Sequence, residues 1–243
     1  MIYEARPGQV SYGEAIGVLL LDTFAPFIPG DVGNASTYSF PVRYKVVKGF
    51  TAERIFNHDL TVLDSLMEAG RELVNEGVKA VTGDCGYMAL YQQQLANELE
   101  VPVFLSSLLQ VPFISRMLKR DEKVGIIVAN SGSFNSTLLN AVGVTEDIPI
   151  SIKGLEDKKN FHQAAIIETG TLDAEKIEQE VVSASRELTA QDPKVKAILL
   201  ECSMLPPYGA AVQKAVNLPV FDYVTMINYV YTALIKRPFT GFM

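Results

Sequence analysis

Two cysteines are the residues of this sequence whose type and placement best suit chemistry. Cys85 lies in the segment VKAVTGDCGYM (78–88), and Cys202 has the same position in a similar segment, VKAILLECSML (195–205). The match continues without a gap to Val-Pro-Val-Phe in the first copy and Leu-Pro-Val-Phe in the second. The chain has no other cysteine. A repeat that matches both thiols therefore indicates where function should be sought.

The matched thiols suggest acid–base chemistry by two groups. Each cysteine ends an apolar strand pattern and precedes a helical pattern, and the backbone N–H groups at a helix start favour a thiolate and lower the thiol pKa. If Cys85 and Cys202 lie on opposite walls of one cleft, one thiolate can remove a proton from a carbon while the other thiol delivers a proton to the opposite face. This arrangement predicts inversion of a stereocentre.

Two other interpretations of the cysteines stay open. Cysteine is among the most buried residue types, so each of them can be a small core residue without chemistry. A disulfide between Cys85 and Cys202 requires Cα atoms closer than about 7 Å, and a reduced pair is more natural in a reducing compartment. The duplication favours the catalytic interpretation.

An acidic residue directly precedes each cysteine, Asp84 in the first copy and Glu201 in the second. Side chains alternate along a strand, so these carboxylates should point away from the face that their cysteines occupy. A carboxylate beside a thiol would also raise the thiol pKa and oppose the helix effect. We therefore expect structural roles for both acids more than catalytic ones.

Polar residues follow the first strand pattern of each copy at matching positions. IGVLLLDT (16–23) aligns with VGIIVANS (124–131), and serines follow further strand ends. Such residues can present hydrogen-bond donors to a carboxylate, although they are also common in ordinary turns. The candidate substrate-binding residues at these strand tips are Asp22, Thr23, Ser106, Asn130, Ser131 and Ser133.

The elements that must position these residues follow an alternating pattern. Runs rich in Val and Ile alternate with amphipathic helical patterns, which is typical of a parallel sheet covered by helices. The expected strands are 15–21, 42–47, 78–82, 101–105, 123–129, 148–152, 195–200 and 218–222. The expected helices are about 59–76, 88–99, 108–119, 133–141, 173–190, 207–216 and 223–235.

The order strand, polar tip, helix, cysteine strand, helix and "PVF" strand occurs twice, which predicts two similar α/β halves. Ligands of such halves bind beyond the carboxyl ends of the strands, so two facing halves would share one cleft. We place the first half, with Cys85, at 1–105 plus 222–243, because the last helix should cross back onto it. The second half, with Cys202, is placed at 106–221.

Composition excludes several classes of function. The 243 residues carry a net charge of −7, whereas nucleic-acid binding requires a basic patch. The two cysteines and two histidines show no chelating spacing, so we expect no metal, and no phosphate-binding or dinucleotide-binding glycine motif is present. The run IGVLLL (16–21) is too short for a signal segment or a membrane span. We expect a cytoplasmic protein that binds neither membrane nor nucleic acid.

The motifs around the cysteines resemble the aspartate/glutamate racemase superfamily, which also includes hydantoin racemase, maleate isomerase and arylmalonate decarboxylase. The resemblance covers nearly the whole chain, and the PGDVGN loop (29–34) with the cysteine–PPY segment is most similar to an uncharacterised branch of it. It implies two Rossmann-like halves, each with helices on both faces of a parallel sheet, related by a pseudo-twofold axis around a cleft. It also implies a homodimer and a cofactor-independent two-base mechanism with Cys85 and Cys202 as the bases.

The resemblance departs from the family pattern beside both cysteines. Glutamate racemases usually have Asn-Thr after the first cysteine and Thr-His after the second. Gly86 and Tyr87 stand in the first pair of places, and Ser203 and Met204 stand in the second. These positions contact the substrate in the family, so the four residues join the candidate substrate contacts and glutamate is not the expected substrate.

These observations predict a cofactor-independent isomerase, a racemase or epimerase of a small carboxylate related to an amino acid. In it, Cys85 and Cys202 exchange the roles of proton donor and acceptor. One alternative is an isomerase or lyase of the same superfamily that uses a single cysteine as nucleophile, as a maleate isomerase-like enzyme would. Another is a ligand-binding protein that has kept the cleft without turnover.

Overall fold

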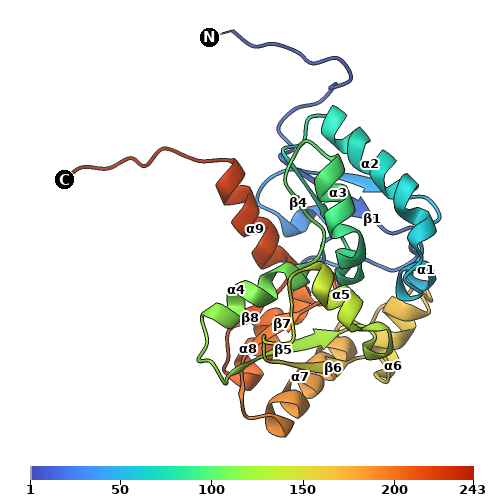
Figure 1. Ribbon diagram of the computed structural model, residues 1–243, viewed down its shortest axis with the longest axis vertical. Coiled ribbons are helices and arrows are strands. Elements are labelled where there is room, and N and C mark those ends of the chain that lie inside the picture. Colours follow the sequence, from blue (N-terminus) through green and yellow to red (C-terminus); the bar gives the residue numbers. More distant parts are fainter. Residues whose placement is uncertain (1) are drawn as a thin grey trace.

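Two lobes, each built on a parallel sheet, make up the computed structural model, which describes residues 2–243 (Figure 1). The first sheet has the strand order β2-β1-β3-β4 and the second has the order β6-β5-β7-β8. Both have four strands, and in both the first strand of the lobe lies beside the cysteine-bearing strand. The repeat in the sequence is therefore a repeat of topology, and the expected α/β fold with two similar halves is confirmed.

The first sheet is formed by β1 (Ile16–Leu20), β2 (Val42–Val46), β3 (Ala80–Gly83) and β4 (Val103–Phe104). Its helices are α1 (Ala52–Phe56), α2 (Leu63–Asn75) and α3 (Gln92–Glu98). Strand β1 is buried on both faces, as a central parallel strand must be. Ile16 and Val18 face one cluster of apolar side chains, whereas Leu19 faces another. Gly17 leaves room for Leu73 of α2, since a Cβ atom there would lie 3.0 Å from the Leu73 side chain.

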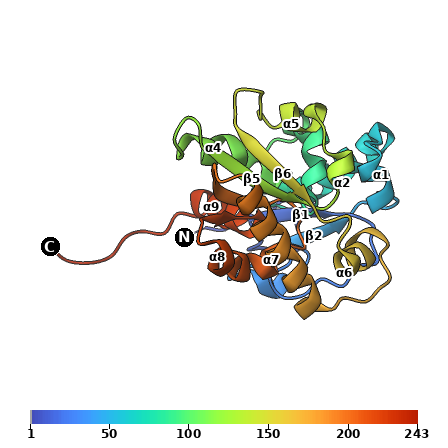
Figure 2. The same ribbon diagram turned by 90° about the horizontal axis from the view of Figure 1, so that it is seen from below.

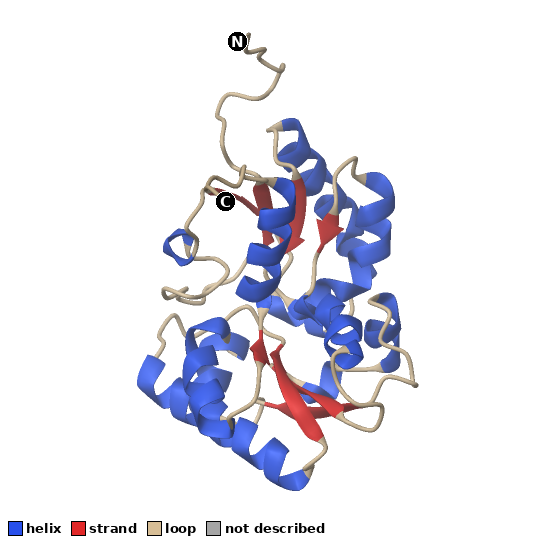
Figure 3. Cartoon of the chain, turned by 90° about the vertical axis from the view of Figure 1, so that its left-hand side faces the viewer, coloured by secondary structure: helices blue, strands red, loops and turns tan. Residues whose placement is uncertain are grey.

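The second sheet is formed by β5 (Lys123–Val128), β6 (Ile150–Gly154), β7 (Val195–Leu200) and β8 (Val220–Phe221). Its helices are α4 (Val111–Arg116), α5 (Ser136–Ala141), α6 (Lys159–Phe161), α7 (Ala174–Gln191) and α8 (Gly209–Val216). Helix α7 begins where the Asp173 side chain accepts a hydrogen bond from the Lys176 backbone N–H at 3.1 Å, a common N-cap. Helices flank the strands of each lobe in Figure 3.

The last helix, α9 (Tyr223–Leu234), packs against the first sheet although it follows the last strand of the second. Tyr223, Met226 and Ile227 share an apolar cluster with Ile16 and Val18 of β1. Figure 1 shows α9 beside the first lobe, with the chain end extending away from it. The boundaries at 105/106 and 221/222 stay a prediction, with which this packing agrees.

All eight expected strands are present, and both ends of each lie within two residues of the expected ones, although β4 and β8 are only two residues long. Two short helices, α1 and α6, were not expected from the sequence. Several expected helices begin with a 3-10 turn, as in Gly86–Tyr91 before α3 and Pro206–Tyr208 before α8. The C-terminal segment extends away from the lobes in the view of Figure 2 as well. Among residues 2–243, no helix combines the length and apolarity that crossing a membrane would require.

Candidate active site

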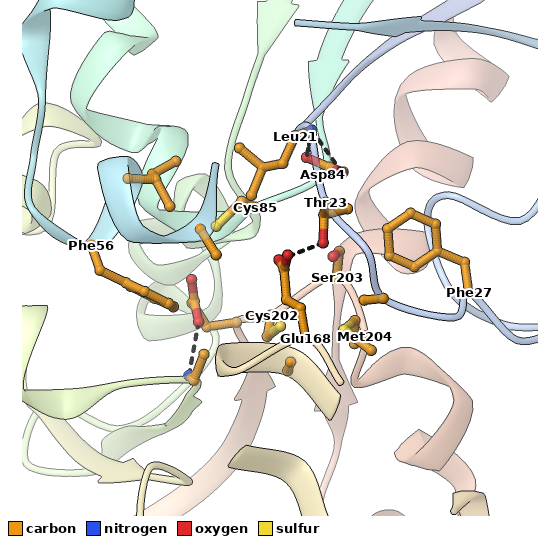
Figure 4. Close-up of a pocket in the computed structure, with 16 residues that line it drawn as sticks. Leu21, Thr23, Phe27, Phe56, Asp84, Cys85, Glu168, Cys202, Ser203 and Met204 are labelled. Atoms are coloured by element: carbon orange, nitrogen blue, oxygen red, sulfur yellow. Dashed lines mark hydrogen bonds between the residues drawn. The ribbon is translucent and has the colours of Figure 1, made fainter. Parts of the chain in front are cut away.

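One cavity is lined by both cysteines. It lies where the carboxyl ends of β1, β3 and β7 approach each other, at the junction of the two lobes, and it contains about 490 Å³ of atom-free space including its opening. Figure 4 shows Cys85 and Cys202 on different sides of this space. Its position beyond the carboxyl ends of the strands is the one expected for a ligand site of parallel sheets. The two thiols thus share one site.

The two cysteines enter the site in similar ways but with different accessibility. Strand β3 ends at Gly83, and Cys85 follows as the residue that starts the 3-10 helix Gly86–Tyr91. Strand β7 ends at Leu200, and Cys202 lies in a turn ahead of the 3-10 helix Pro206–Tyr208. Cys85 is 8% exposed, whereas Cys202 is partly exposed. Both are free thiols.

The expected lowering of the thiol pKa values is wrong. Desolvation in the cavity raises the pKa of Cys85 and of Cys202 well above the ordinary value, and the nearby Glu201 raises both further. The backbone N–H groups of Tyr87 and Met204 act in the opposite direction, as anticipated for a turn start, but they are outweighed. The free-energy cost of burying a thiolate in the cavity exceeds the stabilisation that a backbone N–H group provides to it. Both thiols are therefore neutral at rest.

The acidic neighbours of the cysteines also face the cavity. Asp84 and Glu201 both line it and are buried, which contradicts the expectation that strand alternation turns them away from the site. The reason is that β3 ends at Gly83 and β7 at Leu200, so both acids lie beyond the regular strand and alternation does not apply to them. Burial raises the pKa of Asp84 to about 7 and that of Glu201 to about 8.

A third carboxylate reaches the cavity from the second lobe. Glu168 lies on the loop before α7 and accepts a hydrogen bond from the Thr23 hydroxyl at 2.5 Å and another from the Phe24 backbone N–H at 3.1 Å. Its backbone is in the left-handed region, with φ of 56°, a conformation that is uncommon for a residue with a side chain. Figure 4 draws this hydrogen bond between Glu168 and Thr23 as a dashed line.

Aromatic and apolar side chains complete the wall. Phe27 and Phe56 lie on opposite sides of the space in Figure 4, and Leu21 and Ile55 add apolar surface. No Lys, Arg or His among the described residues lines this cavity. A site with three carboxyl groups and aromatic rings, but without a cationic side chain, suits a ligand that brings a positive charge of its own.

Five of the residues singled out in the sequence meet at this cavity: Thr23, Cys85, Cys202, Ser203 and Met204. Several other residues of the wall are not among the candidate contacts. They include Phe27, Phe56 and Glu168, which carry no motif, and the duplicated acids Asp84 and Glu201, for which the sequence favours structural roles.

Three candidate contacts that follow strands of the first sheet do not line the cavity, and their side chains make hydrogen bonds to backbone groups instead. Asp22 accepts a hydrogen bond from the Gly49 N–H at 2.8 Å, so it fixes the turn after β2. Ser106 is buried and donates to the Gly86 carbonyl at 2.6 Å. Tyr87 is buried, and its hydroxyl donates to the Asn130 carbonyl oxygen.

The tip of the second half is engaged in its own turn. The Asn130 side chain accepts from the Gly132 N–H at 2.9 Å and caps the short 3-10 helix Ser131–Ser133. The Ser131 hydroxyl donates to Glu156, and the Ser133 carbonyl lies 2.8 Å from Nε2 of His58. None of these three tip residues lines the cavity.

Gly86, the remaining candidate contact, does not line the cavity either, but it lies directly against the Glu201 carboxyl group.

Among the described residues, no group of three or more His, Cys, Asp or Glu side chains is arranged to hold a metal ion. The groups that line the cavity and can take part in proton transfer are its two thiols and three carboxyl groups.

Comparison of the sequence with curated proteins finds relatives with one activity in their names. The chain is 30% identical over 234 residues to dimethylsulfoniopropionate lyase of Durusdinium sp. clade D, which covers 93% of this chain and 77% of that protein. It is 31% and 30% identical to dimethylsulfoniopropionate lyases 3 and 5 of Emiliania huxleyi, of which it spans 61% and 47%. Several of these relatives are thus much longer than this chain. No family model matches it.

Solved structures with the same fold carry other activities in their names. Unliganded arylmalonate decarboxylase superposes with a TM-score of 0.60 at 14% identity, covering 91% of this chain and 92% of the other. A glutamate racemase from Bacillus anthracis gives 0.58 at 14% identity, with coverage of 90% and 82%. Aspartate racemase of Picrophilus torridus gives 0.55 at 14% identity, with coverage of 92% and 94%. The expected aspartate/glutamate racemase fold is thereby confirmed.

The relatives correct the expectations of function. The curated relatives are named lyases, so the main expectation of a racemase or epimerase, and of an isomerase in general, is wrong. The expectation of an uncharacterised branch is wrong for the same reason. The alternative of a lyase from the same superfamily agrees better with the relatives. The error arose because two opposed cysteines were assumed to require two proton transfers.

Proposed function

Because the chain belongs to the dimethylsulfoniopropionate lyase family, we propose that it is a lyase that cleaves dimethylsulfoniopropionate, or a closely similar sulfonium carboxylate, by β-elimination. The products of that reaction are a dialkyl sulfide and acrylate. The observation that carries the proposal is the composition of the cavity: two thiols and three carboxyl groups line it, and no cationic side chain of residues 2–243 does.

The charge of the wall supports a sulfonium substrate. Dimethylsulfoniopropionate has a permanent positive charge on sulfur, and aromatic faces and carboxylates attract such cations. Phe27 and Phe56 flank the space, and Glu168 reaches its mouth. A cation held between aromatic rings gains about 0.5–2 kcal/mol per ring face, depending on its desolvation. The substrate thus supplies the positive charge that the wall lacks.

The elimination requires one base. A thiolate takes the proton from the carbon next to the carboxylate, and the C–H electron pair forms the C=C bond of acrylate. The C–S bond breaks with its pair on sulfur, so the sulfide leaves as a neutral molecule that needs no proton. The proposal assigns the base to Cys202, the more accessible of the two thiols, and places Cys85 on the opposite wall.

Substrate binding prepares the base. Both thiols are neutral at rest because desolvation raises their pKa values. A sulfonium group in the cavity favours the charged form of a nearby thiol and lowers its pKa. When the substrate is present, the Cys202 thiol therefore releases its proton to water and becomes the thiolate base, and without substrate it stays protonated.

The proposal is tested by incubating the purified chain with dimethylsulfoniopropionate and measuring dimethyl sulfide in the headspace by gas chromatography. We expect dimethyl sulfide and acrylate in equal amounts. Production no faster than in a protein-free sample, from protein whose circular dichroism shows a folded α/β domain, would overturn the proposed activity. A covalent adduct at Cys202, detected by mass spectrometry during turnover, would replace the base by a nucleophile.

A further inference from the structure

One oxygen of Glu201 is buried in the cavity wall without a hydrogen-bond partner. The Glu201 residue is 0% exposed and lines the cavity. Its Oε2 atom accepts a hydrogen bond from the Ala129 backbone N–H at 3.3 Å, whereas Oε1 has no partner among the described residues. A buried polar atom without a partner costs about 1–3 kcal/mol. Such an atom in the wall of a cavity calls for an explanation, and a ligand bound in the cavity can supply the partner.

The free oxygen lies between the two cysteine segments. A Cβ atom at Gly86 would be 1.9 Å from Oε1 of Glu201, so this oxygen rests on the backbone of the residue that follows Cys85. The backbone of Glu201 is held in place, because the Ser107 hydroxyl donates a hydrogen bond to the Glu201 carbonyl oxygen at 2.8 Å. Glu201 precedes Cys202 in the chain, so Oε1 is fixed near both thiol-bearing turns.

Glu201 is a neutral acid at neutral pH. Burial raises its pKa to about 8, and the titratable groups that face it carry no positive charge: Asp84, Cys85, Tyr87, Glu168 and Cys202. Since Oε2 accepts from the Ala129 N–H, the proton belongs on Oε1. The unpartnered atom is thus an O–H donor in the wall of a cavity that has no cationic side chain from residues 2–243 to offer a substrate carboxylate.

The equivalent acid of the first half provides the contrast. Asp84 accepts from the Leu21 backbone N–H with both oxygens, at 3.1 and 3.2 Å. Leu21 follows β1 as Ala129 follows β5, so the two backbone donors are equivalent. The extra methylene of Glu201 moves its carboxyl group beyond the point where both oxygens can share that donor. Asp84 is therefore a structural counterpart for comparison.

We propose that Glu201 is a catalytic residue of the elimination: as a neutral acid, it donates a hydrogen bond from Oε1 to the substrate carboxylate and stabilises the charge that gathers there when the α-proton leaves. This inference rests on the proposed function. As the C–H bond breaks, negative charge spreads onto the carboxylate oxygens, and a fixed donor in a dry site stabilises it. The Glu201 proton remains on Oε1 while the C–H proton goes to the Cys202 thiolate and the C–S pair leaves with the sulfide.

Protonation of Glu201 has a second consequence for the thiols. The charged form of Glu201 raises the pKa of both Cys85 and Cys202. In the neutral form that repulsion is absent, so the thiolate needed for proton removal forms more easily. Loss of the Glu201 proton above about pH 8 therefore removes a donor and opposes the base at once.

Three variants test the proposal by turnover. Glu201→Leu removes the donor, and we expect kcat to fall by about 10²–10³-fold, the usual loss for one such donor. Above pH 8 we expect kcat/KM of the wild type to fall as Glu201 ionises, whereas Glu201→Gln keeps a neutral N–H donor that does not titrate and should show no such fall. Asp84→Asn, the matched control, keeps that fall. A Glu201→Gln profile with the wild-type fall, or a Glu201→Leu kcat within threefold of wild type, would overturn the proposal.

A binding measurement separates this inference from the proposed function. Calorimetry with acrylate, which has the carboxylate but no sulfonium, should show at least tenfold weaker binding to Glu201→Leu than to wild type. Binding of trimethylsulfonium, which has the cation but no carboxylate, should change by less than threefold. If the wild type releases no sulfide but acrylate binding still depends on Glu201, the proposed function fails and carboxylate recognition stands. Equal acrylate binding by both proteins overturns the recognition itself.

Discussion

The two halves of the molecule have the same strand order but use their duplicated acids differently. In the first half, both carboxyl oxygens of Asp84 accept the hydrogen bond of the Leu21 backbone N–H. In the second half, one oxygen of Glu201 accepts a hydrogen bond from the equivalent Ala129 N–H, and the other oxygen has no hydrogen-bond partner among the described residues. One methylene group therefore separates an acid that ties a loop to a strand end from an acid that can meet a substrate.

The thiols differ in the same direction. Cys85 is 8% exposed and begins a 3-10 helix, whereas Cys202 is partly exposed in a turn. Beside them, Gly86 makes room for the Glu201 carboxyl group, while Ser203 lines the cavity. In the proposed mechanism the second half supplies the base Cys202 and the acid Glu201, and the first half contributes Cys85 and Asp84 to the opposite wall. The duplicated fold supplies two equivalent positions for an acid, and the difference in side-chain length between Asp84 and Glu201 gives the two acids different hydrogen bonds.

The largest expected effect breaks the equivalence of the thiols. Cys202→Ser should lower kcat by about 10³-fold, because the hydroxyl is a far weaker base at neutral pH and general-base removal costs about 10²–10⁴-fold. Cys85→Ser should lower kcat by about tenfold, through altered packing of the opposite wall. Headspace dimethyl sulfide measures both. Equal losses of 10³-fold in the two variants would show that the halves share the proton transfer.

A smaller effect is expected from making the acids alike. Glu201→Asp shortens the side chain to that of Asp84, so its carboxyl group should retract toward the Ala129 N–H. Displacement of a catalytic group by about 1 Å can cost 10²-fold, and we expect kcat to fall by about that factor with little change in thermal unfolding. Turnover at the wild-type rate would show that the methylene group is irrelevant.

The carboxylate at the mouth should matter for binding more than for turnover. Glu168→Gln removes a negative charge near the sulfonium group while keeping an acceptor for the Thr23 hydroxyl. KM should rise about tenfold, equal to about 1.4 kcal/mol, with kcat within twofold, because the charge of the cation is lost only when the sulfide leaves. Glu175→Gln, on the exposed side of α7, is the control. A changed kcat with an unchanged KM would place Glu168 in the chemical step instead.

The buried acids also make stability depend on pH. The pKa of Glu201 is about 8 in the folded chain and about 4.3 when unfolded, so the folded state binds the extra proton between these values. The free energy of unfolding therefore falls as pH rises from about 5 to 8, by about 1.4 kcal/mol per pH unit for this group. Urea unfolding at several pH values should show a shallower slope in Glu201→Gln. Identical slopes would show that Glu201 is ionised in the folded protein.

Much of this architecture was predictable from the sequence, because a duplicated order of elements is visible without a structure. The eight strands follow from Val- and Ile-rich runs, and the two cysteines mark the cavity because they are the only ones in the chain. The short helices α1 and α6 have too few turns for a periodic pattern. Phe27, Phe56 and Glu168 lie in segments that tertiary folding alone brings to the cavity.

Two errors at the site have physical reasons. Strand alternation was applied to Asp84 and Glu201 although both follow the last regular strand residue, where the backbone no longer alternates. The thiol pKa was judged from the start of a turn, whereas desolvation in the cavity dominates it. Duplicated cysteines fit inversion of a stereocentre as well as they fit the proposed elimination, which needs one base, so the sequence pattern alone does not distinguish the two reactions.

The most direct test of the central claim is a proton NMR time course of dimethylsulfoniopropionate with the wild-type chain in D₂O. We expect acrylate and dimethyl sulfide to appear at equal rates, with Cys202→Ser giving neither above background. Deuterium appearing at the carbon beside the carboxylate of uncleaved substrate, with no acrylate formed, would contradict the account, because the two thiols would then exchange protons without eliminating the sulfide.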